Sequence, residues 1–214
     1  MKIGILFDLD GTLLDTLADL TDATNYALAC HGYPPHSKEA VRGFVGNGAQ
    51  RLIAAAVPEG QDFRPVFETF RVYYRDHCQV KTRPYEGILE ALAKIREKYP
   101  VAIVSNKPDF AVKPLCRDYF GDIYALGETP DCPRKPAPDM VYKAMAAIGA
   151  DRCVYVGDSD VDVLTAQNAG ALCLSVLWGF RDQPCIQAAG GQHFCQAPQA
   201  MPEALDALAQ ILKI

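Results

Sequence analysis

Short apolar runs, separated by stretches long enough for helices, constrain this chain more than any other feature of its sequence. The runs occupy residues 3–7, 101–104, 153–156 and 171–177. Runs this short, bounded by Gly, Pro and polar residues, are typical of strands that are buried on both faces of a sheet. Because helical patterns alternate with these strands, the sequence predicts a parallel, three-layer α/β sheet of the Rossmann-like kind.

Residues 16–82 differ from the rest because they contain no strand candidate. Their clearest helical stripe includes Phe63, Phe67, Phe70, Tyr73 and His77, which we interpret as core. We therefore expect an all-helical domain (residues 16–82) inserted into an α/β core (residues 1–15 and 83–214).

The expected elements follow from hydrophobic spacing and from Gly and Pro positions. Expected helices cover residues 15–32, 37–44, 51–57, 63–77, 88–95, 111–120, 138–148, 161–169 and 202–212. Two further strands are expected at residues 123–126 and 193–197. Pro114 should kink its helix if it lies beyond the first turn.

The first apolar run ends at two acids, Asp8 and Asp10. Ligands of open parallel sheets bind outside the carboxyl ends of the strands, and residues two apart in an extended chain point to the same side. Two such carboxylates repel each other unless a cation or a shared proton relieves them. The sequence therefore indicates a divalent metal here, although Asp is also a common turn residue. Gly11 would allow the turn that follows, and the Thr12 hydroxyl could hold it.

Ser105 and Asn106 follow the second run and are expected to open a helix. A hydroxyl and backbone N–H groups at that position could bind an anion, or could simply cap the helix. Lys135 lies in a stretch stiffened by prolines. A stiff backbone would hold its positive charge in one direction; the alternative is a solvated lysine in a loop. The third run is followed by Asp158, Asp160 and Asp162, which fit a hard cation better than a capping turn; no role is assigned to Asp160.

These four clusters, in this order, resemble the motifs of the haloacid dehalogenase superfamily. The resemblance implies that Asp8 attacks phosphorus and forms an aspartyl-phosphate, while Asp10 protonates the leaving alkoxide and then activates water. It implies Mg²⁺ bound by the Asp8 carboxylate, the Asp10 backbone carbonyl and Asp158. Ser105 would hold phosphoryl oxygens, and Lys135 would offset their charge.

The same resemblance suggests positions for further residues. Asp162 would orient Lys135 or a metal-bound water, and Thr12 and Asn106 would help bind the substrate. The helical insert is similar to the cap of the superfamily's phosphoglycolate phosphatase and phosphomutase-like branch. Residues 45–48 followed by Leu52 resemble the phosphoglycolate phosphatase group.

Substrate specificity is expected to come from the insert, called the cap from here on. Asn47 lies between two glycines that permit close approach to a ligand, and Arg42 could pair with a substrate carboxylate. A helix-joining turn with a solvated Arg is the alternative, in which case residues 178–181 could supply specificity.

We therefore expect Mg²⁺-dependent hydrolysis of a small phosphorylated metabolite. Asp10 favours esters over halides, since only an alkoxide needs an acid to leave. Two alternatives remain open: a sugar-phosphate mutase with the same residues, and a phospho-receiver module that does not turn over. The receiver fits less well, because it needs neither a cap nor a leaving-group acid.

Composition limits the cellular compartment and the classes of binding partner that we expect for this protein. The net charge is −5 and no basic run occurs, which argues against nucleic acid and anionic membrane surfaces. No apolar run approaches the roughly 18 residues of a membrane span. The eight Cys residues are scattered without a C-x-x-C pair. We expect a protein of the reducing cytoplasm that is a monomer or a small homo-oligomer.

Overall fold

The computed structural model describes residues 1–213, and its main feature is a parallel sheet with strand order β5-β4-β1-β6-β7-β8. The strands are β1 (Ile3–Phe7), β4 (Val101–Pro108), β5 (Tyr124–Glu128), β6 (Arg152–Gly157), β7 (Leu172–Val176) and β8 (His193–Cys195). Strand β1 lies between β4 and β6, and each of its residues is buried. This position explains why its sequence is apolar throughout rather than alternating.

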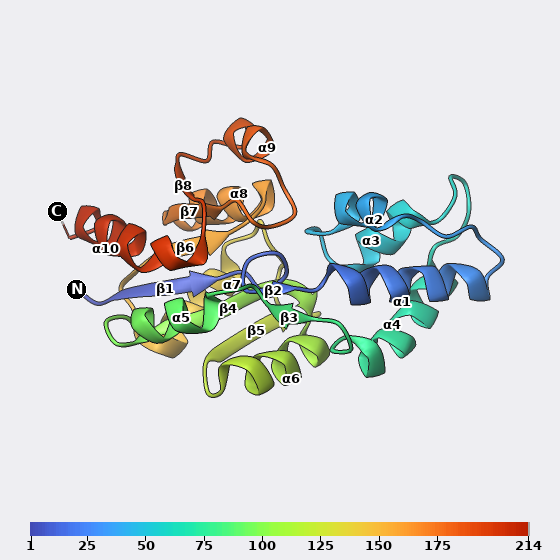
Figure 1. The fold of residues 1–214 in the computed structure, drawn as a ribbon, viewed down its shortest axis with the longest axis horizontal. Coiled ribbons are helices and arrows are strands. Elements are labelled where there is room, and N and C mark those ends of the chain that lie inside the picture. Colours follow the sequence, from blue (N-terminus) through green and yellow to red (C-terminus); the bar gives the residue numbers. More distant parts are fainter. Residues whose placement is uncertain (214) are drawn as a thin grey trace.

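Helices cover both faces of the sheet, which confirms the expected three-layer α/β fold (Figure 1). Side chains of β1 alternate between two cores: Ile5 and Phe7 belong to one, and Leu6 to the other. The first core includes α5 (Ile88–Arg96), α6 (Asp109–Phe120) and α10 (Met201–Ile211), and the second includes α7 (Asp139–Ile148) and α8 (Asp160–Ala169).

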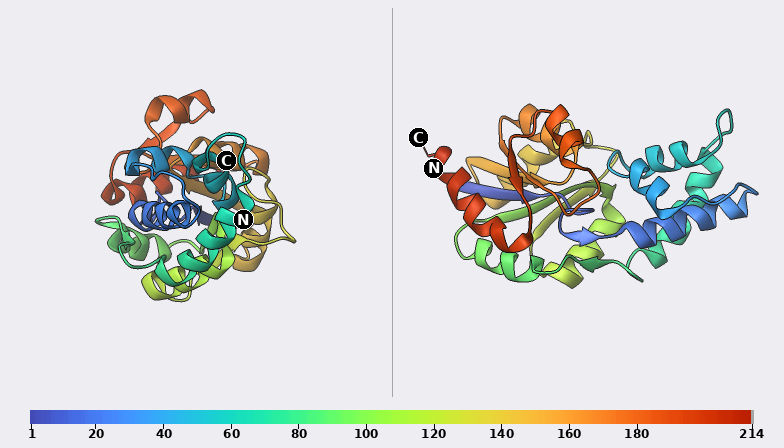
Figure 2. Two further views of the ribbon diagram at one scale, coloured as in Figure 1. Left: turned by 90° about the vertical axis from the view of Figure 1, so that its right-hand side faces the viewer. Right: turned by 45° about the horizontal axis from the view of Figure 1, so that its top comes forward.

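The cap contains α1 (Leu17–Cys30), α2 (Lys38–Phe44), α3 (Ala49–Ala56) and α4 (Arg64–His77). The arrow of β1 points towards the cap, which projects beyond the carboxyl ends of the strands (Figures 1 and 2). The chain enters and leaves the cap through the short antiparallel strands β2 (Leu14–Asp15) and β3 (Arg83–Pro84). These connections hold the cap over the end of the sheet, although the division into two domains stays a prediction.

The structure corrects the sequence analysis in three places. Strand β4 extends to Pro108, so Ser105 and Asn106 lie within a strand and do not open a helix, and α6 begins at Asp109, two residues before the expected helix. The condition set for Pro114 is met, since it lies inside α6 beyond the first turn. The short pair β2 and β3 was not predicted, and neither was α9 (Gln183–Ala188). Within residues 1–213, no helix is both long enough and apolar enough to cross a membrane.

Candidate active site between the sheet and the cap

The sequence-predicted polar clusters meet at one cavity, between the carboxyl ends of the strands and the cap. Its core side is lined by Asp8, Asp10, Ser105, Lys135 and Asp158, among others. These residues are distant in the sequence, but parallel strands bring their carboxyl ends to one edge of the sheet. The cavity is therefore where the candidate chemistry is concentrated.

Lys135 is buried and lies between two carboxylates. Its Nζ is 2.9 Å from Asp8 Oδ1 and 2.8 Å from Asp162 Oδ1, and it donates to the Tyr155 hydroxyl at 3.0 Å. Burial alone would lower the pKa of Lys135, but Asp162 and Asp8 outweigh burial and raise it. Lys135 is therefore a fixed positive charge beside Asp8, as the sequence suggested.

Asp8 is placed in an electrostatically costly position for a carboxylate. Burial raises its pKa to about 7, although Lys135 opposes the shift, and the neighbouring Asp162 and Asp10 add to it. Its Oδ1 is buried and has no well-aligned hydrogen bond, despite the short ion pair with Lys135. A carboxylate oxygen with unused acceptor capacity in this position is suited to bind a cation or to attack an electrophile.

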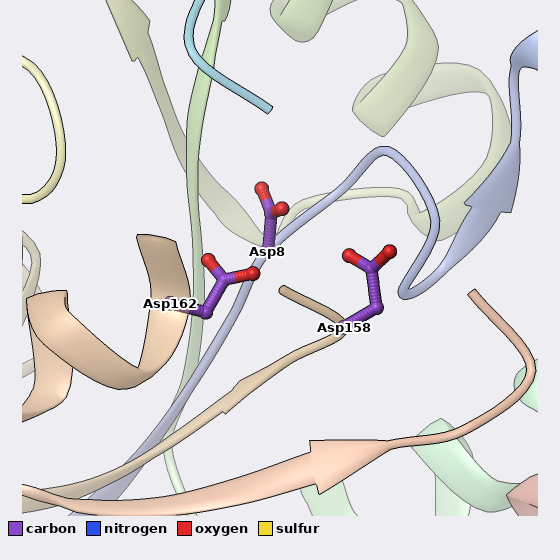
Figure 3. A group of neighbouring side chains, drawn as sticks. All are labelled: Asp8, Asp158 and Asp162. Atoms are coloured by element: carbon purple, nitrogen blue, oxygen red, sulfur yellow. The ribbon is translucent and has the colours of Figure 1, made fainter. Parts of the chain in front are cut away.

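The acidic groups fit a divalent cation. Carboxylate oxygens of Asp8, Asp158 and Asp162 lie within 4.8 Å of one another. Asp8 and Asp158 extend in the same direction from the ends of β1 and β6, whereas Asp162 approaches from α8 (Figure 3). Burial raises the pKa of Asp158 well above its usual value, and Asp162 and Asp8 raise it further. A bound cation would remove this mutual repulsion.

Both carboxylate oxygens of Asp162 already contact neighbouring residues, so Asp162 supports the site and is less suited to bind a cation directly. Its Oδ1 faces Lys135, and its Oδ2 accepts from the backbone N–H of Ser159 at 3.2 Å and from the Ser159 hydroxyl at 2.6 Å. The geometry is consistent with the expectation that Asp162 orients Lys135.

Two contacts fix Asp158. Its Oδ2 accepts from the Phe180 N–H at 2.6 Å, and its Oδ1 accepts from the Thr12 hydroxyl at 3.2 Å. Thr12 therefore contacts Asp158, whereas the sequence analysis placed it against the substrate.

Asp10 faces the cavity but is separate from the three-carboxylate group. Its Oδ1 lies 2.8 Å from Nζ of the buried Lys107. Sequence analysis gave Lys107 no role, although a lysine three residues after an apolar strand run is a signal that could have been followed.

Ser105 and Asn106 line the cavity, and both side chains also contact the protein. The Ser105 hydroxyl accepts from the Lys107 N–H at 3.2 Å. The Asn106 amide donates to the carbonyls of Lys135 and Gly46, and its oxygen accepts from the Lys135 N–H at 2.8 Å. Asn106 therefore joins the Lys135 loop to the cap, and its contact with substrate stays a prediction.

The structure also places Arg42 away from its expected position. The Arg42 guanidinium donates to the carbonyls of Gly179 at 2.8 Å and Phe180 at 2.9 Å. Arg181 donates in the other direction, to the carbonyls of Arg42 at 3.0 Å and Val45 at 2.6 Å. We call this reciprocal pair the arginine clasp; it joins the cap to the loop that holds Asp158.

Asn47 contacts Arg51 within the cap, with Oδ1 accepting from Nη1 at 3.3 Å. The cavity wall contains the neighbouring Gly46 and Gly48, but neither Asn47 nor Arg42. The loop therefore contributes Gly46 and Gly48 to the cavity wall, and specificity roles for Arg42 and Asn47 stay predictions.

Comparison with known proteins identifies what the chain is similar to. A model of the haloacid dehalogenase-like hydrolase family matches residues 5–176. A phosphoglycolate phosphatase from Rhodobacter capsulatus is 34% identical over 199 residues, covering 86% of this chain and 88% of that protein. An N-acetylmuramic acid 6-phosphate phosphatase from Pseudomonas aeruginosa is 33% identical, covering 83% of this chain and 82% of that protein.

A solved structure agrees with these similarities. A crystal structure from Lactobacillus delbrueckii subsp. bulgaricus, of a protein to which phosphoglycolate phosphatase activity is attributed, has a TM-score of 0.89 and 36% identity. The match covers 94% of this chain and 97% of that one. Relatives with two different substrates in their names are about equally similar, so identity alone does not select a substrate.

Proposed function

The chain belongs to the haloacid dehalogenase-like hydrolases, and from this we propose that it is a Mg²⁺-dependent phosphatase that hydrolyses a small phosphate monoester through a phosphorylated Asp8. One observation carries the proposal. Asp8 has a buried oxygen without a hydrogen bond, beside the positive charge of Lys135, and shares a cavity with a second acid, Asp10. Cleavage of a phosphate ester in two steps requires a nucleophile and a separate acid that protonates the leaving group, and Asp8 and Asp10 are the candidates for these roles.

In the first step, an Asp8 oxygen attacks phosphorus and the bond between phosphorus and the ester oxygen breaks. Asp10 gives its proton to the departing alkoxide, and Lys107 keeps the Asp10 carboxyl facing the cavity. In the second step, Asp10 takes a proton from water, which attacks the phosphoryl group and releases Asp8 and inorganic phosphate. Lys135 offsets phosphoryl charge in both steps.

Mg²⁺ would be held by the carboxylates of Asp8 and Asp158 and by the Asp10 backbone carbonyl, and would supply positive charge that offsets the repulsion between Asp8 and phosphate. Asp162 would hold Lys135 in place through their 2.8 Å contact. Ser105 would contribute its hydroxyl and the surrounding backbone to phosphoryl binding, since it lines the cavity.

The substrate we propose is a small phosphorylated metabolite of the phosphoglycolate type, on the support of the named relatives. The decisive test measures phosphate release from a panel of phosphoglycolate, sugar phosphates, nucleoside monophosphates and pyrophosphate, with and without Mg²⁺. Release from at least one ester, without a bisphosphate activator, is expected. No release from any of them would contradict the proposal, and isomerised sugar phosphate would favour the mutase alternative.

We expect Mg²⁺ to be required and to stabilise the fold. Excess chelator should abolish phosphate release. A ligand that binds only the folded state, at 100 times its Kd, stabilises it by about 2.7 kcal/mol. Thermal unfolding with and without Mg²⁺ should therefore show a higher Tm for wild type and a much smaller rise for Asp158→Asn. Asp160→Asn is the matched control, because Asp160 contacts Arg181 at 3.7 Å and lies outside the carboxylate group.

The arginine clasp leads to a different prediction from the one that sequence suggested for Arg42. Because Arg42 binds backbone carbonyls, Arg42→Met should lower kcat/KM for carboxylate-bearing and simple alkyl phosphates by the same factor. Loss of the equivalent of one charge-assisted hydrogen bond, about 1.5–3 kcal/mol, corresponds to roughly 10- to 100-fold. A loss of kcat/KM confined to carboxylate-bearing esters would instead indicate that Arg42 binds the substrate carboxylate directly.

A further inference from the structure

The cap presents an almost wholly apolar wall to the cavity. Among the described residues, the cap residues on this wall are Leu20, Val45, Gly46, Gly48, Ala49, Leu52, Phe70 and Tyr74. Tyr74 is the single member of this set with a polar side-chain group. Tyr74 is therefore the residue on this wall that can recognise a leaving group through a side-chain hydrogen bond.

The Tyr74 hydroxyl is held in place from the core side. Tyr74 lies on α4 and is 1% exposed, and its ring stacks on Phe70 with centroids 5.0 Å apart. Its oxygen accepts from Lys107 Nζ at 2.5 Å, while the same Nζ lies 2.8 Å from Asp10 Oδ1. One lysine thus connects the cap hydroxyl to the acid of the core.

The proton of this hydroxyl is available to a ligand. Burial raises the pKa of Tyr74, so the phenol keeps its proton. Lys107 can only donate, so the Tyr74 oxygen must be the acceptor in their contact, and its own hydrogen is free to point elsewhere. Because the side chain lines the cavity, a bound ester is the partner within reach.

The cations nearest this wall are already engaged. Lys107 is paired with Asp10, and Arg181 binds backbone carbonyls of the cap. On the cap side of this cavity, a leaving group therefore meets apolar side chains and one O–H donor. That combination favours a short organic group with a single acceptor oxygen close to the ester bond.

We propose that Tyr74 determines specificity by donating a hydrogen bond to an acceptor oxygen on the leaving group, next to the ester oxygen that Asp10 protonates. This inference rests on the proposed phosphatase function and extends it to a substrate class: short phosphate esters with a carboxylate or hydroxyl oxygen near the ester carbon. A buried donor rejects analogues that lack the acceptor, because the donor would be left unpaired.

The test compares three probe esters that differ in one group: phosphoglycolate has a carboxylate, 2-hydroxyethyl phosphate has a hydroxyl, and ethyl phosphate has neither. Tyr74→Phe should lower kcat/KM roughly 10- to 100-fold for the preferred acceptor-bearing ester, the scale of one lost hydrogen bond to a charged or desolvated partner. It should lower kcat/KM for ethyl phosphate by a clearly smaller factor, because any effect of the lost Tyr74–Lys107 contact on Asp10 is shared by all three esters. Which acceptor-bearing ester loses more identifies the oxygen that Tyr74 recognises.

Tyr73→Phe is the matched control, because it makes the same chemical change on the same helix, outside the cavity wall. It should leave all three values unchanged. Ratios between probes do not depend on the folded fraction, so partial unfolding of Tyr74→Phe cannot imitate the result. An equal loss on all three esters, or none, would overturn the role of Tyr74. If wild type releases phosphate from none of the panel or probe esters, the proposed function itself fails.

Discussion

Replacing Asp8 by Asn is expected to abolish phosphate release, lowering kcat by roughly 10⁴-fold or more, the scale at which removal of a covalent nucleophile acts. An amide cannot attack phosphorus, and it is a poorer metal ligand than a carboxylate. Neither Asp10 nor Asp162 can substitute, since Lys107 holds the first and Lys135 and Ser159 hold the second. Steady-state phosphate release at saturating Mg²⁺ measures the loss.

The Asp8→Asn variant should still fold, because the Asp8 carboxylate is costly in the metal-free protein. The folded pKa is raised to about 7 from 3.8, so the unfolded chain loses this proton first and stability falls as pH rises across that interval. Asn removes this penalty. The metal-free variant should therefore unfold at a Tm equal to or above that of metal-free wild type at pH 8.

A trapping experiment separates loss of the nucleophile from loss of metal binding. Wild type given substrate and quenched in acid should carry a phosphoryl group that hydroxylamine removes, and Asp8→Asn should carry none. Asp158→Asn, which weakens the metal site but keeps the nucleophile, should still show labelling at high Mg²⁺. Labelling of Asp8→Asn, or substantial turnover by it, would remove Asp8 from the proposed role.

The parts of the fold that the sequence predicted well depend on local pattern. The strand at residues 3–7 is apolar throughout because β1 is central, and its carboxyl end had to lie beside those of β4 and β6. That rule of parallel sheets brings Asp8 and Asp158 to one cavity, and Lys135 reaches it from the loop between β5 and α7. Contacts governed by sheet topology are predictable because the topology has few alternatives.

The parts that the sequence missed depend on contacts between the cap and the core. Helical spacing selected Tyr73 for the core stripe of α4, yet Tyr74 is buried and Tyr73 is less so. A 3.6-residue period cannot separate neighbouring positions at the edge of a stripe. Lys107 was missed for a related reason: its partners, Tyr74 and Asp10, lie on segments far from it in the chain.

Asp10→Asn is expected to slow alkyl phosphates by roughly 10²- to 10⁴-fold, the usual contribution of a general acid or base. An aryl phosphate should lose much less in its first step, because nitrophenolate departs without a proton. The Asp10 carboxyl faces the cavity and Lys107 fixes its Oδ1, so Asn should occupy the same position without a transferable proton. The ratio of kcat/KM for p-nitrophenyl phosphate to that for ethyl phosphate should therefore rise in the variant.

The second step gives this variant a distinct kinetic signature. If Asp10 also takes the proton from water, its loss slows hydrolysis of phosphorylated Asp8. Mixing Asp10→Asn with p-nitrophenyl phosphate should then give a burst of about one nitrophenolate per enzyme, followed by slow turnover. Asp15→Asn serves as the control, because Asp15 accepts from the Leu17 N–H at 3.2 Å near the start of α1 and does not line the cavity. Equal losses on both substrates without a burst would mean that Asp10 only holds Lys107 in place, and the leaving-group acid would have to be sought elsewhere in the cavity.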